Sequence, residues 1–315
     1  MSSPLSPRQS PPPSSRAVSV PPRSPLTSLT LLCLAATWLI WGSTYLAIKW
    51  ALVSFPPFFQ MGTRFVAAGL LLGVFAALRG ARWPTGAQWV TASVLGALML
   101  GGGYGATALA QQHVGSGLVV AFIAVVPALV ALMQWPYGVR PSRLEGAGIA
   151  LGLVGVWLLT RGQGFSASLT GLLAITVACV TWSLGTVWAR HGLPGGPQLT
   201  LAPGAAGIAS QMVAGGLLLL LAAAALDERP VWPPDARALL SWLYLVVAGS
   251  LLAYSAYMVL LARTSATLAS SYTFVNPVIG LLLGVTLGGE VVTTGEWAAA
   301  AVAVAGVVAM LLSRR

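Results

Sequence analysis

The chain has 315 residues, of which 57% are hydrophobic and only 7% are charged, and its mean hydropathy is +0.85. A soluble domain carries about 25% charged residues, so this composition excludes a soluble globular protein and indicates an integral membrane protein. The formal net charge is +10, but the basic residues stand singly between apolar runs. They form no stripe for nucleic acid, and we interpret them as signals of membrane topology.

Residues 1–27 are rich in serine and proline, and we expect them to form a disordered cytoplasmic tail. The apolar run after this tail is too long for a signal peptide and lacks a convincing cleavage site, so we expect it to remain as the first span. Cys33 and Cys179 each lie inside an apolar run, where we expect small buried side chains rather than a disulfide or a metal site.

Ten apolar runs follow the tail, and most have the length of about 20 residues that a helix needs to cross a bilayer. They lie at residues 28–50, 58–78, 87–110, 115–137, 145–160, 168–189, 205–226, 238–261, 266–288 and 294–312. The fifth run is short for a span. Ten crossings would place both termini on the same side of the membrane.

The basic residues predict which side that is, because positive charge collects in cytoplasmic segments. With both termini in the cytoplasm, the cytoplasmic segments hold Arg8, Arg16, Arg23, Arg79, Arg82, Arg140, Arg143, Arg190, Arg263, Arg314 and Arg315. The opposite side then holds only Arg161, Arg229 and Arg237, with Lys49 and Arg64 near that boundary. We therefore expect both termini in the cytoplasm.

The chain also repeats itself. The segment IWGSTYLAIKW from Ile40 parallels TWSLGTVWARH from Thr181, so that Trp41 corresponds to Trp182, and a later match aligns Pro127 with Pro277. This predicts one five-helix repeat at 28–165 and another at 166–315. Since five is odd, the repeats would be inverted relative to each other, an architecture typical of alternating-access carriers.

The stretch 266–290 contains the strongest departure from a plain membrane anchor. Asn276-Pro277 lies near its middle, where the proline removes a backbone donor and favours a broken helix. Gly280, Gly284 and Gly288 follow at four-residue spacing, which favours close helix contact. We predict that Pro127 and Pro277 act as hinges of a moving part.

Uncharged polar and aromatic residues inside the spans are the candidate substrate site. Trp38, Trp41 and Tyr45 share one helix face with Thr44 beside it, and this face either packs against other helices or lines a pathway. Tyr254 with Tyr257, and Tyr272 with Asn276, also share faces, and either bond between helices or face a wet cavity. The predicted lining set is Trp41, Thr44, Tyr104, Trp182, Tyr254, Tyr257, Tyr272 and Asn276.

Other polar residues leave two interpretations open. Gln111, Gln112 and His113 form either an exposed loop or a pH-sensitive gate. Lys49 and Arg64 either attract an anion to the outer mouth or extend their side chains to water. Glu290 is either a proton-coupling group or a helix-end contact.

Enzyme motifs are absent from the sequence. It contains no pair of acids in mid-span, no nucleophile elbow and no phosphate-binding loop, so we expect neither an enzyme nor a bound cofactor. GGGYG at 101–105 lacks a suitably placed lysine, and close helix packing explains it better.

Four segments together resemble the EamA branch of the drug/metabolite transporter superfamily, and within it the YedA-like inner-membrane exporters. They are IWGSTYLAIKWAL at 40–52, PPFFQMGTRFVAAGLLL at 56–72, RLEGAGIALGLVGVWLL at 143–159 and SYTFVNPVIGLLLGVTLGGE at 271–290. The resemblance implies ten helices in two inverted repeats, a bacterial inner-membrane location and efflux of small compounds. The first repeat departs from the family where it reads Tyr137-Gly138-Val139-Arg140 instead of L-G-E.

We therefore predict an all-α membrane protein that exports small amphipathic metabolites or drugs, such as amino-acid-like compounds, by secondary active transport. Import of a nutrient on the same fold is the alternative, and a membrane scaffold would instead have a tightly packed centre. The expected partners are a small-molecule substrate and the lipid bilayer, with the chain a monomer or homodimer.

Overall fold

The computed structural model describes residues 27–114, 116–160, 168–288 and 293–313, and all structural statements below concern these residues. The predicted tail at 1–27 therefore lies outside the described residues except for Thr27. The Thr27 side chain accepts the backbone N–H of Thr30 at 3.3 Å and so caps the first helix.

The described residues form helices joined by connectors. The first repeat contains α1 (Ser28–Ala51), α2 (Pro57–Leu78), α3 (Gly86–Gly96), η1 (Ala97–Gly105), α4 (Ala106–His113), α5 (Ser116–Ile123), α6 (Val126–Met133), η2 (Trp135–Tyr137) and α7 (Arg143–Thr160). The second contains α8 (Leu169–His191), α9 (Ala205–Ala225), α10 (Ala236–Tyr244), η3 (Leu245–Tyr254), α11 (Ser255–Arg263), α12 (Ala266–Ala269), α13 (Tyr272–Gly288) and α14 (Thr294–Leu312).

Nine helical stretches in the described chain are long and apolar enough to cross a membrane. The tenth crossing is α7, whose 18 residues span about 27 Å, slightly less than a hydrocarbon core. It packs along α14, which is one of the nine. Large apolar side chains such as Leu32, Leu78 and Leu240 are exposed on the outer helix faces, as a lipid environment requires. The predicted all-α fold with ten membrane helices is confirmed.

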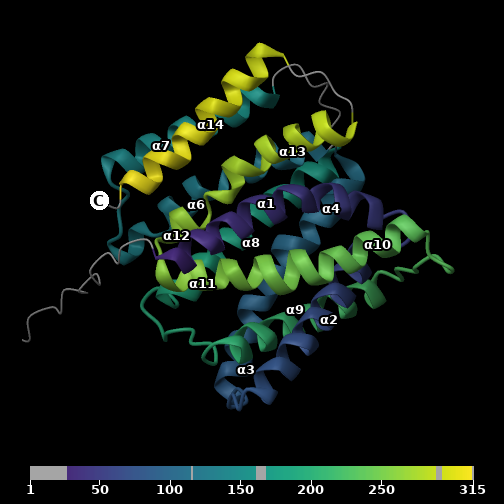
Figure 1. The fold of residues 1–315 in the computed structure, drawn as a ribbon. Helices are drawn as coiled ribbons and strands as arrows, with labels where there is room; N and C mark the ends of the chain where they lie inside the picture. The colour runs from purple at the N-terminus through teal and green to yellow at the C-terminus, as the bar shows by residue number, and fades with distance from the viewer. Residues whose placement is uncertain (1–26, 115, 161–167, 289–292, 314–315) are drawn as a thin grey trace, which may run out of the picture.

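The two repeats pack as inverted copies. The second span of one repeat packs against the second span of the other, α2 against α9, and the two fifth spans pack together in the same way, α7 against α14. The first span of each repeat contacts the fourth span of the other, α1 against α13 and α8 against α6. Figure 1 shows the α7–α14 pair at one edge and the α2–α9 pair towards the opposite edge, with α1 and α8 between them.

Two faces of the molecule serve as reference below. We call the face where α1 begins and α14 ends the terminal face, and the opposite one the distal face. In Figure 1 the start of α1 and the end of α14 lie towards the left. The connectors of the described chain that reach the distal face include 52–56 and 226–235.

The third span of each repeat contains a π-helical segment at its centre, η1 in the first and η3 in the second. π-Helical turns are rare and occur mostly at functional sites. The sequence alone did not predict them. Both segments contain glycines whose missing side chains leave room for neighbours, for example Gly103 beside the Trp182 ring and Gly249 beside Arg64. This confirms that GGGYG serves close helix packing.

The fourth span of each repeat is interrupted, but not as the prolines alone predict. In the first repeat the break falls at 124–125, directly before Pro127 at the start of α6. In the second it falls at 270–271, and Pro277 lies further on, inside α13. The expected break at the centre of 266–290 is therefore wrong, because the chain turns at Ser270-Ser271 while α13 continues through Pro277.

Candidate functional site

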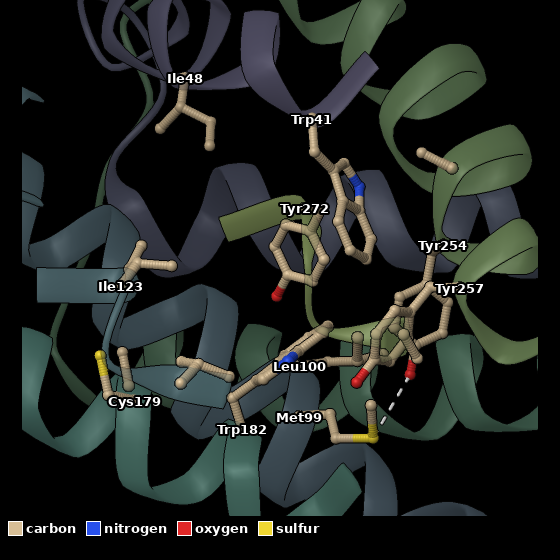
Figure 2. Close-up of a cluster of buried hydrophobic side chains, with 14 of the residues drawn as sticks. Trp41, Ile48, Met99, Leu100, Ile123, Cys179, Trp182, Tyr254, Tyr257 and Tyr272 are labelled. Atoms are coloured by element: carbon tan, nitrogen blue, oxygen red, sulfur yellow. Dashed lines mark hydrogen bonds between the residues drawn. The ribbon is translucent and has the colours of Figure 1, made fainter. Parts of the chain in front are cut away.

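Six aromatic side chains from five spans meet near mid-span, and we call them the aromatic cluster. They are Trp41, Tyr104, Trp182, Tyr254, Tyr257 and Tyr272. Their ring centroids lie 4.5–6.5 Å apart, mostly edge to face, which is the favoured geometry for such rings. In Figure 2 the Tyr272 ring lies between Trp41 and Trp182, with Tyr254 and Tyr257 to one side.

The cluster joins the repeats through residues that correspond in the two halves. The rings of Trp41 and Trp182, which the internal repeat aligns, contact each other at 5.8 Å between centroids. Trp41 also donates its indole N–H to the Gly249 carbonyl in η3, at 3.1 Å. Its counterpart Trp182 has no hydrogen-bond partner for the indole nitrogen among the described residues.

A cavity lies beside the cluster. Its wall is formed by Trp41, Thr44, Tyr45, Ile48, Gly103, Tyr104, Thr107, Ile123, Val126, Ala178, Cys179, Trp182 and Tyr272. Its volume, counted as the space that the centres of water molecules can occupy, is about 50 Å³. One water needs roughly 10–15 Å³ by that measure, so this conformation admits a few waters and must widen to admit a metabolite.

The cavity lies between mid-span and the distal face. On α1 its lining runs from Trp41 to Ile48, towards the distal end of that helix. Tyr104 and Thr107 likewise come from the distal third of the third span. Tyr257, which is fully buried, comes from the part of its span nearer the terminal face. The aromatic cluster therefore separates the cavity from the terminal face.

Five of the residues in the predicted set line this cavity: Trp41, Thr44, Tyr104, Trp182 and Tyr272. The other three support the wall from behind. Tyr257 shares a hydrogen bond of 2.7 Å with the Thr186 hydroxyl, and Tyr254 reaches the Met99 sulfur at 3.9 Å (Figure 2). Asn276 donates to the hydroxyl of Tyr45, which lines the cavity, at 3.4 Å.

Sequence reasoning missed part of the lining. Tyr45 and Ile48 lie four and seven residues after Trp41, and the helical period places them on the same face. Ala178 and Cys179 stand four and three residues before Trp182 and follow the same rule. Ile123 and Val126 flank the break in the fourth span, and no polar atom in their side chains distinguishes them from ordinary core residues.

Arg64 differs most from its expectation. The sequence allowed its side chain to reach water, yet the residue is fully buried. Its Nε donates to the Ser250 hydroxyl at 2.6 Å, and its guanidinium carbon lies 4.9 Å from the centre of the Phe65 ring. Lys49, by contrast, is exposed at the end of α1.

The candidates at the end of the third span stay outside the cavity wall. Gln112 and His113 are exposed at the end of α4, as the loop interpretation expects. Cys33 and Cys179 are free and buried. Glu290 lies outside the described residues.

Comparisons with known proteins agree with this architecture. The model of the EamA-like transporter family matches the chain twice, at residues 28–161 and 169–312. The "Uncharacterized inner membrane transporter YedA" of Escherichia coli K12 is 36% identical over 282 residues, covering 89% of this chain and 90% of that protein.

More distant relatives also align over most of their length. A "Probable amino-acid metabolite efflux pump" of Salmonella typhimurium is 26% identical, covering 85% of this chain and 89% of that protein. A crystal structure with 24% sequence identity has a TM-score of 0.73 and covers 91% of this chain and 98% of that one, which supports the fold. The family model matches both halves of the chain, and the YedA relative is more than 30% identical over most of both proteins. This chain therefore belongs to the EamA-like transporter family and is a membrane transporter, not an enzyme.

Proposed function

We propose that this transporter exports small amphipathic metabolites, with amino-acid-like compounds among them, by alternating access. The observation that carries the proposal is a small cavity between the inverted repeats that the aromatic cluster closes towards the terminal face. Such a site near mid-membrane, at the junction of two repeats, is what alternating access requires.

The composition of the wall supports an amphipathic substrate. Ile48, Ile123 and Val126 offer apolar contact, while the hydroxyls of Thr44 and Tyr45 offer orientation. Ligand sites commonly combine an apolar wall with a few placed polar groups. The Salmonella relative named as an efflux pump for amino-acid metabolites points in the same direction.

The transport cycle would open the cavity towards one face of the molecule while closing it towards the other. The proposed motion rocks one repeat against the other, so that the aromatic cluster parts towards the terminal face while the distal cavity closes. The breaks at 124–125 and 270–271 interrupt the hydrogen-bond ladder of the two fourth spans. Pro127 lies directly after the first break, and Pro277 removes a backbone donor inside α13, so both spans would bend more easily. These prolines are the proposed hinges.

We place both termini in the cytoplasm and the chain in the bacterial inner membrane. Arginines at the terminal face support this orientation, because cytoplasmic loops collect positive charge; they include Arg79, Arg82, Arg140, Arg143, Arg190 and Arg263. The acidic connector with Asp227 and Glu228 then lies outside. In this orientation the cavity described above faces the exterior.

The test uses the purified chain in proteoliposomes and a panel of labelled aliphatic and aromatic amino acids in counterflow. Trp182→Ala should lower transport by about tenfold or more, since it removes a wall from the cavity. Trp297→Ala, on the half-exposed outer face of α14, is the matched control and should transport normally. Unchanged transport by Trp182→Ala would refute the site.

Cells distinguish export from import. Cells that overproduce the protein should lose preloaded labelled amino acids faster than cells that overproduce the Trp182→Ala variant. Accumulation of label above the level of the variant would instead establish the importer.

A further inference from the structure

Arg64 is a buried cation without an anionic partner in the described chain. It is fully buried on α2, and its Nε bonds to Ser250. Its guanidinium carbon lies 5.1 Å from the centre of the Tyr104 ring, on the face that attracts cations. Its Nη2 has no hydrogen-bond partner among the described residues.

No acid of the described chain forms an ion pair with Arg64. Asp227 pairs with Arg229, Glu228 accepts the first N–H groups of α2, and Asp235 caps α10. Glu296 caps α14, and Glu145 lies in the first turn of α7. An unpaired charge within a membrane span is costly and marks functional pathways, so the protein retains Arg64 at an energetic disadvantage.

Only one layer of side chains separates this charge from the cavity. Tyr104 lines the cavity on one side and lies against the guanidinium on the other. Thr44, also in the wall, meets Arg64 across Gly249: a Cβ atom on that glycine would lie 2.8 Å from Nη2 and 3.2 Å from the Thr44 methyl. Glycine at 249 is therefore what allows the charge to approach the wall.

The wall itself offers an unused donor. Trp182 lines the cavity, and its buried indole nitrogen lacks a partner among the described residues. An indole N–H can only donate, as can a guanidinium. A ligand that brings an acceptor oxygen would satisfy the indole N–H, and a negative charge on that ligand would be attracted by the guanidinium behind the wall.

The second repeat shows that packing does not require the charge. Thr63–Leu72 reads TRFVAAGLLL and Ser210–Leu219 reads SQMVAGGLLL, which aligns Arg64 with Gln211. Gln211 is fully buried too, and its Nε2 lies 3.5 Å from the Met99 sulfur in η1, just as Arg64 contacts Ser250 in η3. The same position on the inverted copy thus accepts a neutral amide.

We propose that Arg64 gives the cavity a fixed positive potential and selects substrates that carry a carboxylate over equally apolar amines. This deepens the proposed export function by naming the charge class of its substrate. In a medium of low dielectric constant, a charge one layer behind the wall still attracts an anion and repels a cation strongly. Arg64 is therefore a specificity-determining residue, and its influence extends through Tyr104 and Thr44.

The experiment compares two ligands of the same apolar size and opposite charge, phenylacetate and phenethylamine. Their dissociation constants are measured by calorimetry on the detergent-purified protein. The wild type should bind phenylacetate about tenfold or more tighter than phenethylamine. Arg64→Gln, which installs the side chain of the second repeat, should abolish this preference, and Arg64→Lys should retain most of it because the charge stays.

A matched control changes the counterpart position. Gln211→Met alters the second repeat without changing the charge and should leave the ratio of the two dissociation constants intact. If Arg64→Gln and Gln211→Met changed the ratio of the two dissociation constants equally, the role of Arg64 would be structural and the proposal would be overturned. A wild type that prefers phenethylamine would overturn it as well, even if no Arg64 variant folds.

Transport separates this proposal from the proposed function. Proteoliposome counterflow of the same two labelled compounds is measured alongside binding. Transport of the amine with no carboxylate preference would keep the exporter and reject the role of Arg64. Preferential binding of phenylacetate without its movement across the bilayer would support Arg64 and reject the transport of this class.

Discussion

The helices α2 and α9 are the same structural part built twice, and they differ in one respect. Each is the second span of its repeat, each packs against the other, and both share a run of glycine and leucine after a buried polar residue. In α2 that residue is Arg64, and in α9 it is Gln211. The backbone frame is thus shared, while the charge is confined to one helix.

The comparison teaches that symmetry and specificity are separable in this fold. Inverted copies should match where backbones touch, because the proposed alternating-access cycle would use the same contacts in exchanged roles. Side chains that face the cavity need not match. Arg64 places a charge near the distal side of the cavity, and the equivalent position in the other repeat holds the neutral amide of Gln211. The surroundings of the cavity therefore differ chemically between its two sides.

The largest effect should come from breaking the shared frame. A Cβ atom on Gly69 would lie 2.9 Å from the backbone nitrogen of Val213 in α9, so Gly69→Ala must push the two helices apart. We expect a loss of about 1–3 kcal/mol in the free energy of unfolding. Thermal unfolding of the purified protein measures it.

Gly73→Ala is the control on the same helix. Its added methyl would lie 3.8 Å from the Ala209 Cβ, an ordinary contact, and it should be neutral or slightly stabilising. Equal melting temperatures for the two variants would mean that α2 and α9 do not depend on this close approach.

A smaller effect should distinguish the two corresponding tryptophans. Trp41→Phe removes the indole N–H that donates to the Gly249 carbonyl, whereas Trp182→Phe removes an indole N–H that has no hydrogen-bond partner among the described residues. The first variant should therefore lose about 1 kcal/mol more of the free energy of unfolding than the second. Denaturation of both proteins in the same detergent tests this order, and a reversed order contradicts the asymmetry.

The smallest effect concerns how the two helices begin. Pro56 precedes α2 and offers no side-chain cap, and Glu228 from the second repeat supplies it by accepting Phe59 N–H at 2.7 Å. α9 begins after Gly204 with no side-chain cap. Glu228→Gln should cost about 0.5–1 kcal/mol and speed amide exchange in the first turn of α2.

The neighbouring acid is the control for that prediction. Asp227 forms an exposed pair with Arg229 at 2.9 Å, and exposed pairs contribute little to stability. Asp227→Asn should therefore leave both the melting temperature and the exchange of α2 unchanged. If it acted like Glu228→Gln, the whole connector rather than the cap would be responsible.

Much of the fold was predictable because a bilayer demands it. Hydropathy and run length located ten spans, and the odd number of spans in each repeat implied inversion, without any knowledge of contacts. Even the short fifth run was recognised, and it became α7, a helix of 18 residues. The helical period likewise placed Trp41, Thr44 and Tyr45 on one face.

The candidate site was predictable only in part. Trp182 and Tyr272 stand on different spans from Trp41, and their aromatic type in mid-span was the only indication that they would meet it. Tyr254 and Tyr257 gave the same indication, yet they pack behind the wall, because a side chain's depth depends on neighbouring helices. The break at Ser270-Ser271 escaped notice since proline dominated the local sequence.

What the sequence determined by itself is the membrane class, the ten helices and the repeat, since these depend on local hydropathy and on periodicity along one chain. Tertiary structure decided which polar groups are buried and what they face. Arg64 is the clearest case: seven residues from the start of α2, it could have reached water, and only the packing of η3, Tyr104 and Gly249 around it enclosed the charge. Burial is a property of all the surrounding helices together, and no single segment encodes it.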